Sequence, residues 1–487
     1  MSTSRIIDGF KATVGARLFN TVANGLLIFL LAGVLLSPDE YGLLFLVISI
    51  VSIAQIGSDL GLARSAARYV SDRKETDPGS VRFVLRTSIR YRLLLLGLVA
   101  GALVVGRDVI ALVLETPELT VLLLVGALYL CAISLYSYHQ TLFQGFNRVE
   151  LSARIEVINS LGRVVFVVAF TALGLGVAGA LFGYVLGAGI AAVTGAVLLY
   201  RRFYTAYPES GGSRSLRNRL LEYSVPLTAS QSANVLDRQF DTVLVGYFLT
   251  PVAVSYYVLG KQISEFVTVV SGSLGFSISP SFGEQKATES LERAARLYET
   301  SLQYVLLLYL PAAVGLFLVA DPAISLVFGV EYAGAAPVLQ VLGIYVVFQS
   351  ITDITTNSLD YLGRAKARAI AKGVTSVANV VLNVVLIPIY GVVGAAIATV
   401  VTFGIYTLVN VYVMHLELSL DVWRLGRAVG IAGGIAGAMG VAVLSLVPYV
   451  STLPTLVGVV VVGIGVWAGL AVVSGLVDPR EAVAQLT

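Results

Sequence analysis

Long apolar runs separated by short polar connections make up most of the chain. A helix needs roughly 20 apolar residues to cross about 30 Å of hydrocarbon, and about fourteen runs are long enough. We therefore predict an all-α, polytopic membrane protein with spans at about 11–36, 41–62, 84–106, 118–143, 152–174, 177–200, 222–248, 252–276, 297–320, 336–359, 367–389, 392–414, 426–447 and 453–476. Connections as short as Leu249-Thr250-Pro251 require antiparallel neighbours.

Basic residues are concentrated in alternate connections. One set contains, among others, Arg64, Arg68, Arg73 and Lys74, whereas the other set contains only Arg107. Because Lys and Arg accumulate in cytoplasmic loops, the asymmetry predicts a multi-pass protein of the plasma membrane with both termini in the cytoplasm.

The polar stretch Arg201 to Leu220 divides the spans into two similar sets of six. Ser37-Pro38 after the first span corresponds to Thr250-Pro251 after the seventh, and two further phrases recur in the same order. An even number of spans per set predicts parallel repeats related by an axis along the membrane normal, with substrate between them. The predicted divisions are an N-terminal six-helix bundle (1–200), a cytoplasmic linker (201–221), a C-terminal six-helix bundle (222–415), and two further helices with a cytoplasmic tail (416–487).

Composition supports the membrane assignment. The chain is 57% hydrophobic and only 13% charged, whereas about a quarter of the residues in a soluble domain are charged. Its formal charge of +3 is confined to particular loops, so we expect no nucleic acid partner. The single cysteine, Cys131, lies in an apolar run and is predicted to be a small core residue.

Polar residues in two equivalent spans predict a solvated cavity. The first span has Arg17, Asn20, Thr21 and Asn24 at the spacing of one helix face. Such a face avoids lipid, so we expect it to point inward. The equivalent seventh span has a matching polar face with Ser230, Gln231, Asn234, Asp237, Arg238 and Asp241.

The charges around the hairpin at Thr250-Pro251 have two interpretations. Asp241 and Lys261 are about equally far from the turn and so lie at a similar depth in the membrane, and Arg238 and Glu265 correspond less closely. One interpretation is that these residues form ion pairs that hold the hairpin together. Ligand contact is the other. Asp237 is the remaining acid and is a candidate site for a cation or a proton.

Arg163 lies near the middle of the fifth span, where a charge costs a few kcal/mol. Its nearest acid on the same helix face, Glu156, is two turns away. An arginine without a local partner indicates an anionic ligand, and its planar fork suits phosphate oxygens. Arg17 is a similar candidate, although it is also placed to reach the inner interface.

Two spans carry small residues at every fourth position, which predicts close helix packing. They are the sixth (Gly179, Gly183, Gly187) and the thirteenth (Gly426, Gly430, Gly434). No nucleotide-binding loop, zinc-binding His pair or nucleophile elbow is evident, so we expect no enzyme activity and no cofactor. The acidic pair Asp39-Glu40 would suit a membrane glycosyltransferase or ligase, but a solvated turn explains it more simply.

Several short phrases resemble the Wzx-type polysaccharide flippases of the multidrug/oligosaccharidyl-lipid/polysaccharide exporter superfamily. They include Ser37-Pro38-Asp39-Glu40-Tyr41-Gly42, Gly57-Ser58-Asp59-Leu60-Gly61, Tyr223-Ser224-Val225-Pro226-Leu227 and Phe328-Gly329-Val330-Glu331-Tyr332. The chain departs from the family at Ser255-Tyr256-Tyr257, where Gly-x-Tyr is more usual.

The resemblance implies a flippase that moves a polyprenyl phosphate- or pyrophosphate-linked oligosaccharide from the inner to the outer leaflet. Its implied partners are this lipid-linked substrate, membrane lipids, a coupling cation (Na⁺ or H⁺) and glycan-assembly enzymes. The predicted substrate-binding residues are Arg17, Asn20, Asn24, Arg163, Asn234, Arg238 and Lys261, and the predicted coupling residues are Asp237, Asp241 and Glu265. A cation-coupled multidrug antiporter of the same superfamily is the alternative, and a glycosyltransferase or ligase is the second.

Overall fold

The computed structural model describes residues 3–208, 213–269, 271–272, 275, 282 and 291–475. All regular structure in these residues is helical, which confirms the predicted all-α fold. Contacts group the chain into two units, Met1–Ser255 and Tyr256–Thr487. Their boundary lies within helix α9, whereas the predicted division at the polar linker stays a prediction.

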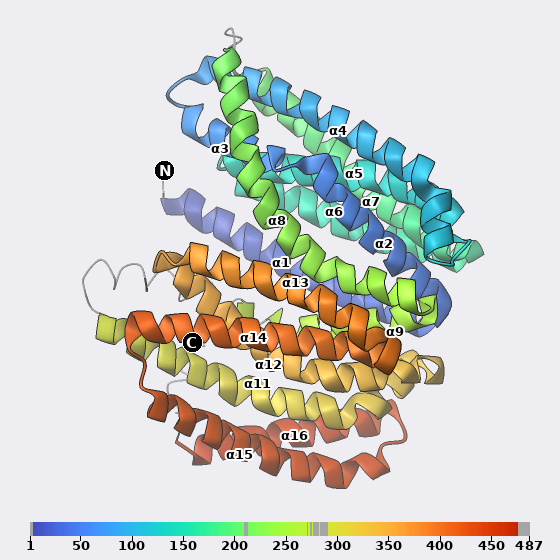
Figure 1. The fold of residues 1–487 in the computed structure, drawn as a ribbon, viewed down its shortest axis with the longest axis vertical. Coiled ribbons are helices and arrows are strands. Elements are labelled where there is room, and N and C mark those ends of the chain that lie inside the picture. Colours follow the sequence, from blue (N-terminus) through green and yellow to red (C-terminus); the bar gives the residue numbers. More distant parts are fainter. Residues whose placement is uncertain are drawn as a thin grey trace. The chain divides into compact units, whose positions relative to one another are not determined.

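Unit 1 is a bundle of long helices with one short amphipathic helix, α3, between two of them (Figure 1). Its helices are α1 (Thr3–Leu30), α2 (Pro38–Asp59), α3 (Leu62–Arg73), α4 (Pro78–Val113), α5 (Leu119–Gly145), α6 (Val149–Phe170), α7 (Gly176–Leu199), α8 (Arg214–Phe248) and the first residues of α9 (Pro251–Val267). Much of the polar stretch after Arg201 is therefore helical, because α8 begins at Arg214.

Local sequence explains where α2 begins and ends. The Ser37 side chain accepts a hydrogen bond from the Glu40 N–H (3.3 Å), and the Glu40 carboxylate accepts one from the Ser37 N–H (3.0 Å). This capping box satisfies two N–H groups that the helix leaves unpaired, so Glu40 has a structural role at this turn. At the other end Leu60 and Gly61 adopt positive φ (40° and 69°), which ends α2 and turns the chain into α3.

Close contact between α6 and α7 confirms the first glycine prediction. A Cβ atom on Gly187 would lie 2.6 Å from the Arg163 backbone nitrogen and 3.0 Å from the Asn159 carbonyl oxygen. Gly183 likewise faces the backbone of Val167. Only glycine permits this approach of two helix backbones, so the glycines of α7 position the helix that carries Arg163.

Unit 2 contains the rest of α9, six further long helices and two short 3-10 helices among the described residues, the second of them at Val447–Tyr449 (Figure 1). A core of buried residues around Tyr298, Tyr309, Val346 and Met414 joins α11, α12, α14 and α15. The further helices are α11 (Leu291–Phe328), α12 (Ala336–Tyr361), α13 (Ala365–Tyr390), α14 (Val392–Leu418), α15 (Val422–Leu446) and α16 (Leu453–Val473), with a short 3-10 helix (Val330–Ala335) before α12.

Helix α11 contains Pro311, which has no N–H to donate to the carbonyl of Leu307 one turn earlier. The indole Nε1 of Trp467 in α16 donates to that carbonyl at 2.8 Å. In a membrane an unpaired carbonyl costs several kcal/mol. The contact thus satisfies an acceptor that the proline leaves open.

The second glycine prediction is wrong. A Cβ atom on Gly426, Gly430 or Gly434 of α15 would meet nothing within 4 Å. Helix α15 packs on α11 through a different face, with Ala432, Ile435 and Met439 buried. Spacing alone cannot tell a packed glycine face from an exposed one.

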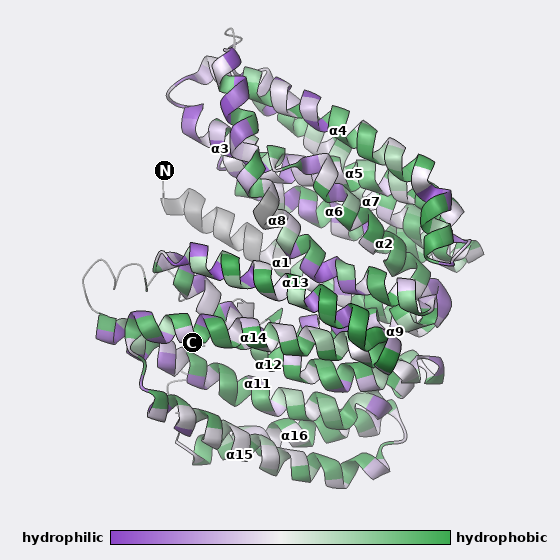
Figure 2. Cartoon of the chain, in the orientation of Figure 1, coloured by the Kyte–Doolittle hydropathy of each residue, from purple (hydrophilic) through white to green (hydrophobic). Residues whose placement is uncertain are grey.

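Eleven stretches of the described chain are helical, long and apolar enough to cross a membrane. One of them, Val149–Tyr204, contains two of the predicted spans. Helix α8 is excluded because charged residues interrupt it, and α9 because it is short. The count of fourteen therefore stays a prediction. Burial differs between these stretches: 11% of the most apolar window of Pro78–Val113 is buried, against 61% for Leu119–Gly145. Figure 2 shows that α4 is largely hydrophobic.

Candidate functional site

Two polar side chains of α1 meet two of α6. The Arg163 Nη2 donates a hydrogen bond to the Asn24 amide oxygen, and the Ser160 hydroxyl donates to the Asn20 amide oxygen at 2.7 Å. Asn20 and Asn24 are one turn apart on α1, so the polar face expected on this helix is turned toward α6 within unit 1. Arg17 also belongs to α1, but its side chain lies outside the described residues.

The ring of Tyr184 lies against Arg163. Its guanidinium carbon lies 5.5 Å from the ring centre of Tyr184, which packs edge-on against Tyr129 at 5.6 Å. In the described part of the chain no carboxylate pairs with Arg163, and its buried Nε has no hydrogen-bond partner. A half-buried cation held only by an amide and an aromatic face attracts an anion.

The predicted residues of α8 differ in exposure. Asn234 and Arg238 are exposed, Asp237 is half-buried, and Asp241 is fully buried at 1% exposure. Each makes interactions within the structure. Helix α8 lies beside α2, where the Ser49 hydroxyl donates to the Gln239 side chain at 2.9 Å.

Lys261 and Glu265 belong to the part of α9 that lies in unit 2. Lys261 is half-buried with its ammonium 5.6 Å from the ring centre of Tyr257, and Glu265 is exposed. The predicted pairings with Asp241 and Arg238 would join residues of the two units, so they stay predictions.

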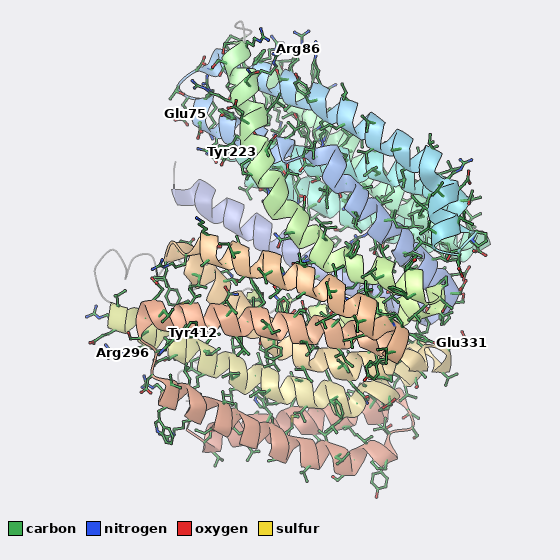
Figure 3. All side chains as sticks on the ribbon, in the orientation of Figure 1. Glu75, Arg86, Tyr223, Arg296, Glu331 and Tyr412 are labelled. Carbon is green, nitrogen blue, oxygen red and sulfur yellow. The ribbon has the colours of Figure 1, made fainter. Side chains whose placement is uncertain are left out.

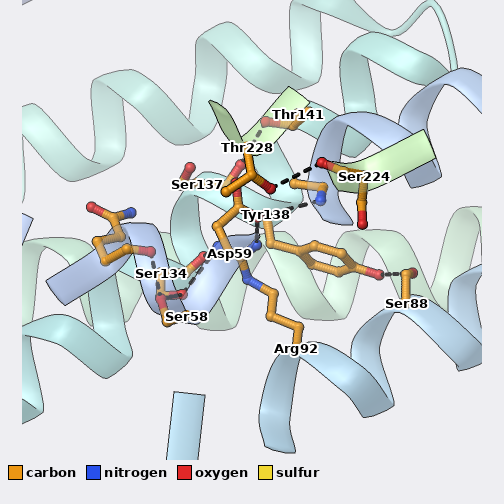
Figure 4. Close-up of polar contacts among 12 residues, drawn as sticks. Ser58, Asp59, Ser88, Arg92, Ser134, Ser137, Tyr138, Thr141, Ser224 and Thr228 are labelled. Atoms are coloured by element: carbon orange, nitrogen blue, oxygen red, sulfur yellow. Dashed lines mark hydrogen bonds and ion pairs between the residues drawn. The ribbon is translucent and has the colours of Figure 1, made fainter. Parts of the chain in front are cut away.

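A buried ion pair in unit 1 was missed by sequence reasoning (Figure 4). Arg92 of α4 is completely buried and its Nη1 donates to the Asp59 carboxylate. Its Nη2 donates to the Ser134 carbonyl (2.7 Å) and hydroxyl (3.0 Å). The Ser58 and Ser134 hydroxyls are also hydrogen-bonded to each other (3.1 Å). The sequence shows Arg92 at the start of an apolar run and Asp59 in the phrase Gly57–Gly61, but it does not show that these two residues of different helices meet.

Asp59 also lines a polar cavity of about 220 Å³ between α2, α5 and α8. Ser52, Gln55, Ser137 and Thr228 contribute polar groups to its wall. The Asp59 side chain is 18% exposed, whereas Arg92 is 0% exposed. Only the acid of this pair is therefore open to solvent.

Unit 2 has a polar face on α12 that the sequence analysis did not single out. On α12 the Tyr345 hydroxyl donates to Gln349 (2.9 Å), and the Gln349 amide donates to the Asp353 carboxylate (2.6 Å). Their regular four-residue spacing could have revealed this polar face. On α13 the Asn383 amide donates to the Asn379 side chain at 3.0 Å. Within the described residues, no three His, Cys, Asp or Glu side chains come together to hold a metal ion.

Comparison with known proteins identifies the family. The profile described as "Polysaccharide biosynthesis protein" matches residues 12–286, more than half of the chain. The profile described as "MatE" matches residues 226–385.

Two relatives from Haloferax volcanii match parts of the chain. The "Probable low-salt glycan biosynthesis flippase Agl15" is 27% identical over 213 residues, 44% of each chain. The "Probable flippase AglR" is 24% identical over 311 residues, 63% of each chain. The chain therefore matches less than two thirds of the length of either relative.

Solved structures share the fold. The inward closed conformation of the lipid II flippase MurJ has a TM-score of 0.77 and 14% identity, and the match covers 98% of this chain and 100% of that one. An inward-facing multidrug resistance transporter of the MATE family has a TM-score of 0.70 and 16% identity, over 83% and 94% of the two chains. The chain therefore belongs to the polysaccharide biosynthesis protein family, within the multidrug/oligosaccharidyl-lipid/polysaccharide exporter superfamily.

Proposed function

We propose that the chain is a flippase that moves a polyprenyl phosphate- or pyrophosphate-linked oligosaccharide from the inner to the outer leaflet. The glycan would serve surface polysaccharide or glycoprotein synthesis, together with glycan-assembly enzymes. Family membership and the flippase names of two relatives support this proposal. A glycan cannot cross hydrocarbon unaided, so a polar path must carry it while the lipid tail stays in the membrane. Alternating access of the two halves would provide that path.

The observation that carries the proposal is that Arg163 lies within a membrane-spanning helix and has a hydrogen-bond donor without a partner among the described residues. A charge within a membrane-spanning helix costs a few kcal/mol and usually marks a substrate path. Asn24 occupies one guanidinium nitrogen, while Nη1 makes no hydrogen bond to any described residue. The open edge of a guanidinium suits a phosphate oxygen.

Other predicted residues have assigned roles in this proposal. Arg17 and Arg163 hold the phosphate, while Asn20, Asn24, Asn234, Arg238 and Lys261 contact the substrate. Asp237, Asp241 and Glu265 respond to a coupling cation, Na⁺ or H⁺, or to the membrane potential. The protein would lie in the plasma membrane with both termini in the cytoplasm.

Replacing Arg163 tests the proposal. A hydrogen bond to a charged group contributes about 1.5–3 kcal/mol, so Arg163→Gln is expected to slow flipping at least about tenfold. Arg163→Lys keeps the charge without the fork and should give an intermediate rate. Purified protein is reconstituted with a fluorescent oligosaccharide on a short polyprenyl pyrophosphate. The measurement is the rate at which a membrane-impermeant glycosidase gains access to the glycan.

Arg148→Gln is the matched control, because Arg148 is exposed and already paired with Glu150 at 3.4 Å. It should flip substrate at the wild-type rate. If Arg163→Gln matches this control at equal reconstitution, the phosphate role of Arg163 is wrong. If the wild-type protein itself flips no lipid-linked glycan, the flippase proposal fails.

The MatE match over residues 226–385 favours a cation-coupled multidrug antiporter as the second candidate function. In that case Asp237 and Asp241 of α8 would bind an organic cation. Ethidium uptake into the same proteoliposomes, driven by a Na⁺ or proton gradient, distinguishes the two functions. Ethidium transport without glycan flipping would support the antiporter.

A further inference from the structure

A basic pocket of about 610 Å³ lies between α4 and the beginning of α8. Three arginines contribute to its wall: Arg90 from α4, and Arg214 and Arg217 from α8. Thr87 and Tyr91 add hydroxyl groups from α4. Figure 3 labels Arg86 nearby, at the same end of α4. The volume is in the range of small-ligand sites, about 300–1,000 Å³.

The three arginines of this pocket lack carboxylate partners among the described residues. Many other arginines of the chain are paired, such as Arg73 with Asp77 (2.9 Å) and Arg364 with Glu417 (2.6 Å). Because no carboxylate of the described residues lies between these three cations, an anion bound among them would lower their mutual repulsion. The pocket is therefore complementary to a ligand with at least one negative charge.

The apolar part of the pocket continues along a lipid-facing helix. Phe83 and Leu94 line it, and Leu94 is 62% exposed. Farther along α4, Leu98 is 63% exposed, and Gly97 and Gly101 leave open space beside the helix. An acyl chain could pack along this smooth apolar surface while its charged head stays at the arginines.

We propose that this pocket binds the phosphate headgroup of an anionic membrane phospholipid. Basic pockets between membrane helices attract anionic lipids, and arginine suits phosphate because it donates in a planar fork. The pocket is formed by α4 and the first turn of α8, whereas Arg163 and its contacts lie on α1, α6 and α7. The substrate residues proposed on α8 begin at Asn234, about five helical turns after Arg217. The lipid therefore occupies a site separate from the proposed substrate path, and this inference does not depend on the flippase proposal.

Binding of phosphatidylglycerol to the purified protein tests the proposal. The variant Arg90→Gln/Arg214→Gln/Arg217→Gln is compared with the control Arg201→Gln/Arg202→Gln/Arg219→Gln, which removes the same charge from exposed positions outside the pocket. Native mass spectrometry counts bound lipid while phosphatidylglycerol or phosphatidylcholine is added in neutral detergent. Wild type and control should prefer phosphatidylglycerol, and the pocket variant should bind it at least about tenfold more weakly.

Three outcomes overturn the proposal. They are equal binding by the pocket variant and the control, equal binding of phosphatidylcholine and phosphatidylglycerol by wild type, and displacement of phosphatidylglycerol by an equimolar polyprenyl phosphate. The last result would assign the pocket to the carrier lipid. If the triple variant does not fold, the single variants Arg90→Gln and Arg217→Gln replace it, each with an expected loss of about fivefold.

Discussion

Arg163 and Arg92 are both arginines within apolar helices of unit 1, but their surroundings differ. Arg92 is completely buried and holds Asp59, the Ser134 carbonyl and the Ser134 hydroxyl. Arg163 is half-buried and has one amide partner. The first is bound within the protein, whereas the second has donors to spare for a ligand.

The two members of the buried pair should differ in their effect on stability. Breaking a buried ion pair costs about 3–5 kcal/mol because the remaining charge is left unpaired. Asp59→Asn leaves the charge of Arg92 unpaired in a site that is 0% exposed. Arg92→Met leaves the charge of Asp59 unpaired, but this side chain is 18% exposed and lines the cavity. We expect Asp59→Asn to lower the free energy of unfolding more than Arg92→Met does. Thermal denaturation in detergent, read by gel filtration, compares the two.

Arg148→Met is the control for charge removal, since Arg148 is exposed. It should leave the denaturation midpoint within the error of wild type. A larger loss for Arg92→Met than for Asp59→Asn would show that the cavity does not hydrate the acid.

The sequence predicted some of these contacts and missed others for a physical reason. The spacing of Asn20 and Asn24 predicted a polar face on one helix, and the lack of a local acid singled out Arg163. Periodicity reports which residues share a face, but it cannot show which helix that face meets. The pairing of Arg92 with Asp59 was therefore missed, and the Asn24 partner of Arg163 came only from the structure.

At the scale of helices, α7 determines how closely α6 approaches. Gly187 lies against the backbone of Arg163 and Asn159, so the same contact fixes the position of the candidate substrate-binding arginine. Sequence spacing predicted this contact correctly in α7 and wrongly in α15. The two glycine rows are similar in spacing, and only the position of the neighbouring helix distinguishes them.

Adding one methyl group at Gly187 should therefore have a measurable effect. Gly187→Ala places a Cβ 2.6 Å from the Arg163 nitrogen, which requires the helices to separate. We expect a loss of about 1–3 kcal/mol in the free energy of unfolding and slower flipping, because Arg163 shifts with its helix. The same denaturation and flipping assays measure both.

Gly189→Ala in the same helix is the matched control, because nothing lies within 4 Å of its added Cβ. It should preserve stability, or raise it by up to about 1 kcal/mol through helix propensity. Equal behaviour of the two variants would mean that α6 tolerates a wider separation from α7.

At the scale of the whole molecule, length and hydropathy predicted an all-helical membrane protein, and the fold matches that of superfamily transporters. The span count was harder to establish, since α8 carries Asp237, Arg238 and Asp241 in its midst. A helix with a polar face has a lower mean hydropathy than a helix that lipid surrounds on all sides. Such a helix is therefore harder to recognise as a membrane span. The charged residues of α8 that suggest a function therefore also make this helix harder to identify as a membrane span.

Orientation can be tested with single cysteines. In a Cys131→Ala background, Glu75→Cys lies after α3 and Glu118→Cys lies before α5, and both positions are exposed. The distribution of Lys and Arg predicts that Glu75 is cytoplasmic and Glu118 external. A membrane-impermeant maleimide added to intact cells should label Glu118→Cys only, and both variants after the cells are opened. Labelling of Glu75→Cys in intact cells would reverse the orientation.

The hydrogen bond from Trp467 to the Leu307 carbonyl joins α16 to α11 within unit 2. Proline bends a helix by removing one rung of its hydrogen-bond ladder, and here an indole from α16 replaces that rung. Helix α16 therefore supplies a donor that α11 cannot provide from its own backbone. A shortened protein that ends after α15 would leave the Leu307 carbonyl oxygen without this donor, at a cost of several kcal/mol in hydrocarbon.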